Sequence, residues 1–452
     1  MKRVYEELGV HIPVVYLPDR DVDLTKWAVV ACDQYTPQPE YWEQVERLVG
    51  NSPSTLRIIF PEAFLHEEDA EERIKHINAT MKRYLDEDVI LPQEPGLILV
   101  DRQTAYSKSR KGLILALDLE KYDYRQNAHS LIRATEGTVV DRLPPRIKVR
   151  GNASIELPHI MVLIDDPEKT VIEPLAEKAE SFEKLYDFDL MLNGGHIRGY
   201  RIDRQEAIEE VIRALGRLAD PELFRSKYGL KGEEAVLLFA VGDGNHSLAT
   251  AKECWEAIKA DLSWEEAQTH PARYALVELV NIHDEGLAFE PIHRVVFGIN
   301  PEGFLEAMTA YFHDQAAGFR CRLFDVKETM EEEAGKRPVK PGCHRFTFVL
   351  KGKYGIGEVE GSGYNLVVGT LQAFLDHYIA AHPEIRVDYI HGEEVVDTLG
   401  SQEGNMGFFL PAMDKKELFR TVILEGVLPR KTFSMGEADE KRFYLECRKI
   451  RD

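Results

Sequence analysis

The sequence predicts an α/β (α+β) protein in which helices flank a mixed sheet, with a further α/β unit at the C-terminus. Short apolar runs, typical of buried strands, alternate with longer segments of helical spacing. Two hairpin signals interrupt this alternation. At 452 residues the chain is too long for one ordinary core. We therefore expect an N-terminal and central domain over 1–299 and a C-terminal domain over 300–452.

Composition narrows the class of protein. An apolar content of 44% and a charged content of 30% are typical of a soluble globular protein. The net charge of −22 argues against nucleic acid or an anionic membrane as partner, although a local positive pocket is compatible with it. The five cysteines include no Cys-x-x-Cys pair, which favours a reducing cytoplasm without structural zinc. No transmembrane run and no signal peptide are predicted.

The first part of the chain predicts strands and helices in alternation. Apolar runs predict strands at 10–17, 27–31 and 56–60. Helical spacing predicts helices at 39–48 and 69–86, the first with proline in its opening turn. Two glycine-led runs, 96–102 and 112–118, predict a hairpin joined by a basic loop.

The remaining elements follow the same rules. Asn193-Gly-Gly-His196 predicts a hairpin turn. Strands are expected at 159–164, 188–192, 198–202, 274–282 and 407–410. Helices are expected at 205–219, 301–313, 370–382 and 414–425, with a charge-dense loop at 327–340.

The chain is organised around a predicted strand (235–241), a polar turn (Gly242–Ser247) and a helix (248–258). Glycine permits positive φ and close approach of a ligand. Asn245 or Ser247 is expected to cap the helix, and the amides of its first turn attract an anion. A phosphate or carboxylate site is therefore predicted. A turn stabilised only by Asp243 is the structural alternative.

Several motifs resemble, in order, those of a bacterial and archaeal family, the domain of unknown function (DUF) family 1015. The matching segments are 242–252, 279–287, 291–295 and 426–433, while Cys32–Tyr35 and Arg133–Thr138 sit where the family has its N-terminal polar motifs. The resemblance covers nearly the whole chain. It implies no function, because none is firmly assigned to that family.

The turn is also similar to the Asp-Gly-x-His-Arg motif of the ParB and sulfiredoxin superfamily, which includes nucleotide hydrolases, a sulfinate-phosphorylating reductase and free-serine kinases. That resemblance implies a ParB/sulfiredoxin-like core and a cradle for nucleotide phosphates. Here Ser247 stands where the motif usually has arginine, and Asn245 where a histidine is common. The missing guanidinium would have to be replaced by Arg133, Arg142, Arg294 or Lys431.

Candidate site residues are assigned from these patterns. Asp243 is the predicted metal ligand or nucleophile-orienting acid, and His246 the predicted acid–base residue. The predicted nucleotide-binding residues are Gly242, Gly244, Asn245, Ser247, Arg133, Thr138, Arg142 and Arg294. The predicted substrate-binding residues are Asp33, Tyr35, Glu136 and His293. Structural roles remain an alternative for each: a capping histidine, a solvated loop or a salt bridge.

The leading hypothesis is a nucleotide-dependent phosphotransferase or phosphohydrolase that acts on a small hydroxylated metabolite, like a serine kinase. ADP or ATP with Mg²⁺ would be the cofactor. The expected partners are the nucleotide and the metabolite, without nucleic acid or membrane, and a homodimer is compatible with the sequence. One alternative is a non-catalytic, nucleotide-binding regulatory protein. Another is a metal-dependent hydrolase built on Asp165-Asp166.

Overall fold

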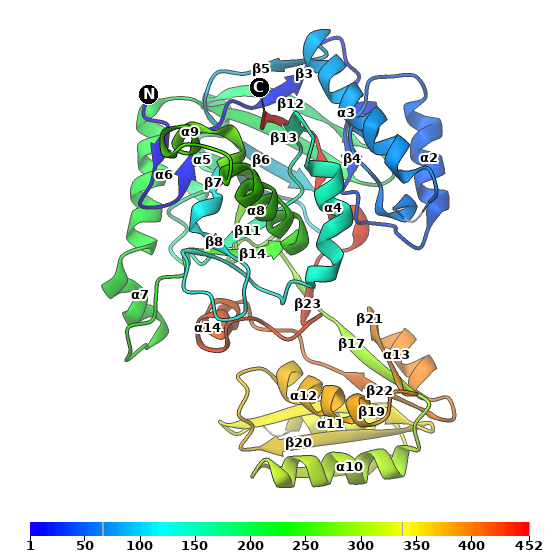
Figure 1. The fold of residues 1–452 in the computed structure, drawn as a ribbon. Coiled ribbons are helices and arrows are strands. Elements are labelled where there is room, and N and C mark those ends of the chain that lie inside the picture. The colour runs from blue at the N-terminus through cyan, green and yellow to red at the C-terminus, as the bar shows by residue number, and fades with distance from the viewer. Residues whose placement is uncertain (66, 337, 452) are drawn as a thin grey trace. The chain divides into compact units, whose positions relative to one another are not determined.

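A computed structural model describes residues 1–65, 67–336 and 338–451 and divides the chain into two compact units (Figure 1). The first unit comprises Met1–Ala288 and Met435–Asp452, and the second comprises Phe289–Ser434. Both units combine helices with a sheet, which confirms the predicted α/β class. No helix in the described ranges is long and apolar enough to span a membrane.

An 11-stranded sheet forms the centre of the first unit, with its main path in the order β12-β13-β6-β7-β15-β11-β14-β9-β8. The pairs β11–β15, β14–β9 and β8–β9 are parallel and the other pairs are antiparallel, so the sheet is mixed as predicted. The strands of this sheet are β1 (Val4–Tyr5), β2 (Val10–His11), β6 (Leu97–Gln103), β7 (Arg110–Asp118), β8 (Tyr122–Asp123), β9 (Ile132–Ala134), β11 (Met161–Ile164), β12 (Glu183–Leu190), β13 (Gly195–Ile202), β14 (Phe239–Asp243) and β15 (Tyr274–Asn281). Both predicted hairpins, β6–β7 and β12–β13, are present.

The two faces of this sheet carry separate apolar cores because successive side chains of a strand point to opposite faces. Leu97 and Leu99 of β6 belong to one core, whereas Ile98 and Val100 belong to the other. The first core is completed by α5 (Glu173–Glu177), α6 (Gln205–Leu218) and α8 (Asn245–Lys259). The second is completed by α1 (Leu24–Trp27), α2 (Pro39–Val49) and α3 (Ala70–Asp86).

Shorter elements complete the first unit. The helices are α4 (Leu143–Arg150), α7 (Pro221–Tyr228) and α9 (Trp264–Thr269). The strand pairs are β3 (Tyr16–Pro18) with β5 (Ile90–Pro92), β4 (Val29–Val30) with β24 (Phe443–Tyr444), and β10 (Ile155–Glu156) with β25 (Arg448–Lys449).

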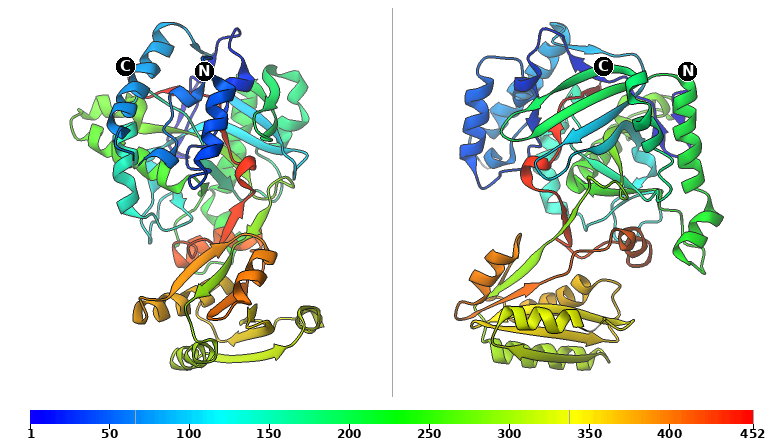
Figure 2. Two further views of the ribbon diagram at one scale, coloured as in Figure 1. Left: turned by 90° about the vertical axis from the view of Figure 1, so that its right-hand side faces the viewer. Right: turned by 180° about the vertical axis from the view of Figure 1, so that it is seen from behind.

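The last residues of the chain return to the first unit, where the red segment runs among its strands (Figures 1 and 2). β24 and β25 pair there with strands from the first third of the sequence. The predicted division at 299/300 differs from this arrangement at both ends. The apolar residues Phe443–Leu445 lie in the core of the first unit. Local periodicity shows that such residues are buried but does not show which core they join.

The second unit contains a six-stranded sheet in the order β18-β20-β19-β22-β17-β21. Its strands are β17 (His293–Phe297), β18 (Gly318–Phe324), β19 (Cys343–Leu350), β20 (Lys353–Glu360), β21 (Arg386–Ile390) and β22 (Asn405–Phe409), with a separate pair formed by β16 (Phe289–Pro291) and β23 (Phe433–Met435). Its helices are α10 (Pro301–Asp314), α11 (Lys327–Lys336), α12 (Val367–Ala381), α13 (Glu393–Gly400) and α14 (Lys415–Glu425).

Two local predictions were wrong. The expected strand at 56–60 contains instead a 3-10 turn at Thr55–Arg57, whose N-terminus is capped by the hydroxyl of Ser54. Most of the expected loop at 327–340 is helix α11, because its glutamates, methionine and alanine are good helix formers despite their charge.

Candidate functional site

The central turn joins β14 to α8 through Gly244, which has a φ of 79°. A Cβ at this position would lie 3.1 Å from the Cα of Ile160, so both the conformation and the space favour glycine. Gly244 itself occupies the N-cap, and no side chain caps the helix there. The predicted capping by Asn245 or Ser247 was therefore wrong, since both already lie in the first turn of α8.

Gly242 is also restricted by its surroundings. A Cβ there would lie 2.8 Å from the side chain of Leu163 and 2.9 Å from that of Met435. The glycine therefore lets β14 lie close to the neighbouring strand β11 and to the returning C-terminal segment.

Asp243 is paired with Lys441, which the sequence analysis did not single out. The Lys441 Nζ lies 3.0 Å from Asp243 Oδ2, and the Gly244 amide donates to Oδ1 at 2.9 Å. Burial raises the pKa of the Asp243 carboxyl, but the charge and hydrogen bond of Lys441 outweigh it and hold the pKa below its ordinary value. The carboxylate is thus charged, with a cation directly beside it.

The loop after β9 meets this turn because β9 and β14 are adjacent and parallel. The Thr135 amide donates to Asn245 Oδ1 at 3.3 Å, and the Val139 amide to His246 Nε2 at 3.3 Å. In the same loop Glu136 is half-buried, and the Thr138 hydroxyl oxygen is buried without a hydrogen-bond partner. Asn245 and His246 therefore hold two loops together.

The guanidinium of Arg133 is bonded to backbone carbonyl oxygens. It donates to the carbonyl oxygens of Ser130 and Ala235 at 2.8 and 2.7 Å, and burial lowers its pKa to about 10. The predicted anion clamp is therefore replaced by a structural role. Arg142 is exposed at the end of a 3-10 turn, where its carbonyl accepts from Arg146.

The Cys32–Tyr35 loop follows β4 and belongs to the same unit. Tyr35 has a φ of 53° and stacks on Tyr41 with ring centroids 3.7 Å apart. Asp33 accepts a hydrogen bond from the Gln34 side chain. The negative charge of Asp33 acts on both Cys32 and Tyr444, which places this carboxylate near the returning C-terminal segment.

A chain of hydrogen bonds connects the turn to this loop. Ser247 Oγ lies 2.8 Å from His159 Nε2, and the Tyr444 hydroxyl lies 2.8 Å from His159 Nδ1. Tyr444 also donates to Cys32 Sγ at 3.0 Å and accepts from the Cys32 amide at 3.2 Å. All four residues line a cavity of about 140 Å³ whose wall also holds the ion pair Glu62–Arg146 at 2.5 Å; the remaining wall is largely apolar.

His159, Tyr444 and Lys441 were missed by sequence reasoning. His159 is the first residue of the strand predicted at 159–164, although β11 itself begins at Met161, and Tyr444 lies in a terminal segment assigned to another domain. Neither residue had a local signal for a site. An isolated lysine such as Lys441 gives no signal either. The pairing of β24 with β4 brings Lys441 and Tyr444 to the site, and the pairing of β11 with β14 brings His159 there.

His293 and Arg294 belong to the second unit. His293 Nδ1 accepts from the Leu410 amide at 3.1 Å. Arg294 is fully buried and donates to carbonyl oxygens of the same unit, including that of Arg430 at 3.0 Å. The other candidate cation of that unit, Lys431, is exposed and has a φ of 54°.

Asp165 and Asp166 are engaged by protein groups. Asp165 contacts Lys227 at 3.0 Å, Tyr228 at 2.6 Å and His283 at 2.6 Å. Asp166 accepts from backbone amides in the turn that follows it. Within the described ranges no three His, Cys, Asp or Glu side chains are grouped so that they could hold a metal ion.

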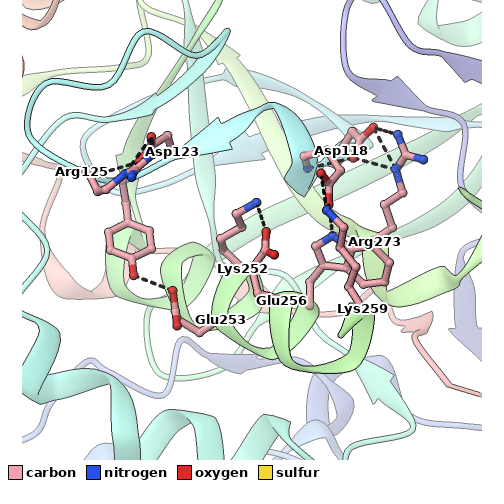
Figure 3. A network of polar contacts seen from close by, with 11 residues as sticks. Asp118, Asp123, Arg125, Lys252, Glu253, Glu256, Lys259 and Arg273 are labelled. Carbon is pink, nitrogen blue, oxygen red and sulfur yellow. Dashed lines mark hydrogen bonds and ion pairs between the residues drawn. The ribbon is translucent and has the colours of Figure 1, made fainter. Parts of the chain in front are cut away.

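A network of polar contacts joins α8 to the residues around β8 (Figure 3). Glu253 accepts from the Tyr124 hydroxyl at 2.6 Å, and Lys259 contacts Glu120 at 2.7 Å. The adjacent pair Arg273–Asp118, at 2.7 Å, is nearly buried and fixes the start of β15. The C-terminal half of α8 is thereby held to the residues around β8.

Comparison with known proteins identifies the family. The family model described as "Protein of unknown function (DUF1015)" matches residues 16–378, and the chain belongs to this family. Among curated proteins there is no match.

Three solved structures are similar over most of their length. A conserved hypothetical protein from Pyrococcus furiosus is 13% identical, with a TM-score of 0.34 and coverage of 74% of this chain and 90% of that one. A mutant of a free serine kinase, in complex with ADP, is 11% identical, with a TM-score of 0.37 and coverage of 75% and 92%. SbnI from Staphylococcus aureus is 10% identical, with a TM-score of 0.33 and coverage of 72% and 83%.

Proposed function

We propose that this member of the DUF1015 family binds the phosphates of a nucleotide at the N-terminal end of α8 and transfers a phosphoryl group to a small hydroxylated metabolite or to water. The observation that supports it most is the turn itself: Gly244 starts α8 without a capping side chain, and Lys441 lies beside it. A helix N-terminus with an adjacent cation is a site for a phosphate. The ParB/sulfiredoxin-like core is part of this proposal.

Lys441 would supply the positive charge that the missing motif arginine would have carried. It is held 3.0 Å from Asp243 and its side chain is only 12% exposed, so the ammonium is already partly desolvated and positioned. A lysine acts on phosphate as a point charge without the bidentate geometry of arginine. The carboxylate of Asp243 would then position the ammonium and orient a hydroxyl group.

Asp243 fits a protein-held Mg²⁺ poorly. Lys441 and the Gly244 amide occupy its two oxygens, and no cluster of three ligand side chains exists in the described part of the chain. Magnesium prefers several oxygen ligands and would be repelled by the lysine. The proposed reaction therefore has no step on a metal held by the protein.

A second candidate function is a regulatory protein that binds the nucleotide without turning it over. The pairing of Asp243 with Lys441 favours it, because a carboxylate neutralised in this way is a weaker base. The two candidates differ only in turnover, so both predict binding at the same turn.

Thermal shift with ADP, ATP and CTP, each with and without Mg²⁺, tests the proposal. All four tryptophans, at positions 27, 42, 255 and 264, lie in the first unit, so intrinsic fluorescence reports its melting alone. Lys441→Met should weaken binding by ~10–100-fold, the loss expected for a charged hydrogen bond. Lys82→Met, at an exposed position of α3, is the matched control. No shift with any nucleotide would refute the proposal, and phosphate release or transfer separates the two candidates.

A further inference from the structure

The hydrogen-bond partners in the series Ser247, His159, Tyr444 and Cys32 indicate where each proton lies. The Tyr444 hydroxyl has one hydrogen, which it donates to Cys32 Sγ, and it already accepts from the Cys32 amide. With that hydrogen on Cys32 Sγ, the remaining lone pair of the Tyr444 oxygen accepts from His159 Nδ1. We assign His159 to the tautomer that matches this arrangement, with Nδ1 protonated and the Nε2 lone pair accepting the hydrogen of Ser247.

Ser247 thus has the surroundings of an activated hydroxyl. A base lies 2.8 Å from its oxygen, and a third group orients that base from the other ring nitrogen. Burial raises the pKa of both Tyr444 and Cys32, so the two groups keep their protons and hold the tautomer. The half-buried Ser247 lies in the first turn of α8 and lines the cavity that His159 also lines.

We propose that Ser247 is a nucleophile that receives a phosphoryl group from a nucleoside di- or triphosphate, with His159 as the general base. This inference rests on the proposed function. The Ser247 oxygen attacks the terminal phosphorus, its proton passes to His159 Nε2, and the bond from phosphorus to the bridging oxygen breaks. The shortened nucleotide leaves with that electron pair, and phosphoserine remains.

The second half of the cycle returns the enzyme to its starting state. The hydroxyl of an acceptor, or water, attacks the phosphorus and releases its proton to solvent. The Ser247 oxygen leaves and takes back the proton held on His159. The cavity, at about 140 Å³, is far below the ~300–1,000 Å³ of pockets that enclose drug-sized ligands. It can hold a phosphoryl group or a small acceptor, whereas the body of a nucleotide would lie outside.

Mass spectrometry of acid-quenched protein tests this step. After incubation with ATP or ADP, the full-length protein should gain the mass of one phosphoryl group on Ser247. Ser247→Ala should gain none, and Ser181→Ala, in a distant 3-10 turn of the same unit, should match the wild type. His159→Gln should slow the reaction ~10²–10⁴-fold. Tyr444→Phe, which removes a positioning group, should lower the rate without changing nucleotide affinity.

A second measurement detects phosphoserine even if it is too short-lived to accumulate. The wild-type protein, without any acceptor, should exchange labelled product nucleotide into substrate nucleotide, because formation of phosphoserine is reversible. Nucleotide binding without phosphoserine and without exchange would overturn this inference while the proposed function stands. Absence of nucleotide binding would overturn both.

Discussion

Replacing Gly244 by alanine tests the geometry on which the site depends. The native φ of 79° costs an L-residue ~1–2 kcal/mol. The added Cβ would also lie 3.1 Å from both Cα and Cγ1 of Ile160, so that residue would have to move. We expect Gly244→Ala to lower the free energy of unfolding by ~1–3 kcal/mol. Gly244→Val would add a larger clash and should also block an anion.

The measurement is denaturant-induced unfolding of the first unit, monitored through tryptophan fluorescence. Gly216→Ala is the matched control, because Gly216 lies within α6, has no atom within 4 Å of a built Cβ and no positive φ. Alanine there should stabilise the unit by ~0.5–1 kcal/mol. The two variants should therefore shift the midpoint in opposite directions. Equal stability of Gly244→Ala and wild type would show that the left-handed turn is not required.

Three further outcomes are expected. Asp243→Asn should strengthen nucleotide binding by up to ~10-fold, because it removes a negative charge and frees Lys441, while abolishing turnover; calorimetry showing weaker binding would contradict this. Burial, with two arginines nearby, lowers the pKa of His11 to about 3, whereas the unfolded chain binds this proton near pH ~6.5. The free energy of unfolding is therefore unaffected by His11 above pH ~6.5. Below that pH, protonation of His11 in the unfolded chain lowers it by ~1.4 kcal/mol per pH unit, down to pH ~3. His11→Phe should flatten this slope in pH-dependent unfolding, and an unchanged slope would assign it to other groups. Gly112→Ala would place a Cβ 2.2 Å from Glu278 Oε1 and should cost ~1–3 kcal/mol in the same fluorescence assay; wild-type stability would show that Glu278 can move.

Local patterns determined much of the fold. The spacing of apolar residues predicted α3 and α6 to within a residue or two, and the turn at Asn193–His196 predicted the β12–β13 hairpin. Polar residues at a strand end also predicted that the loop after β9 and the central turn would belong to one site. The structure does bring Thr135 and Val139 to Asn245 and His246. Such features depend on neighbours in the sequence, so periodicity and turn chemistry reveal them.

The partners of the site were decided only by the tertiary structure. Lys441 meets Asp243 across 198 residues, and Tyr444 meets Cys32 across 412. Both contacts depend on the return of the C-terminal segment to the first unit, where β24 pairs with β4. Periodicity shows that a strand has a buried face, but strand order decides which distant side chain lies beside it. For the same reason the sequence offered Arg133 only as one of four candidate cations, whereas the fold bonds that arginine to carbonyl oxygens and places Lys441 at the turn.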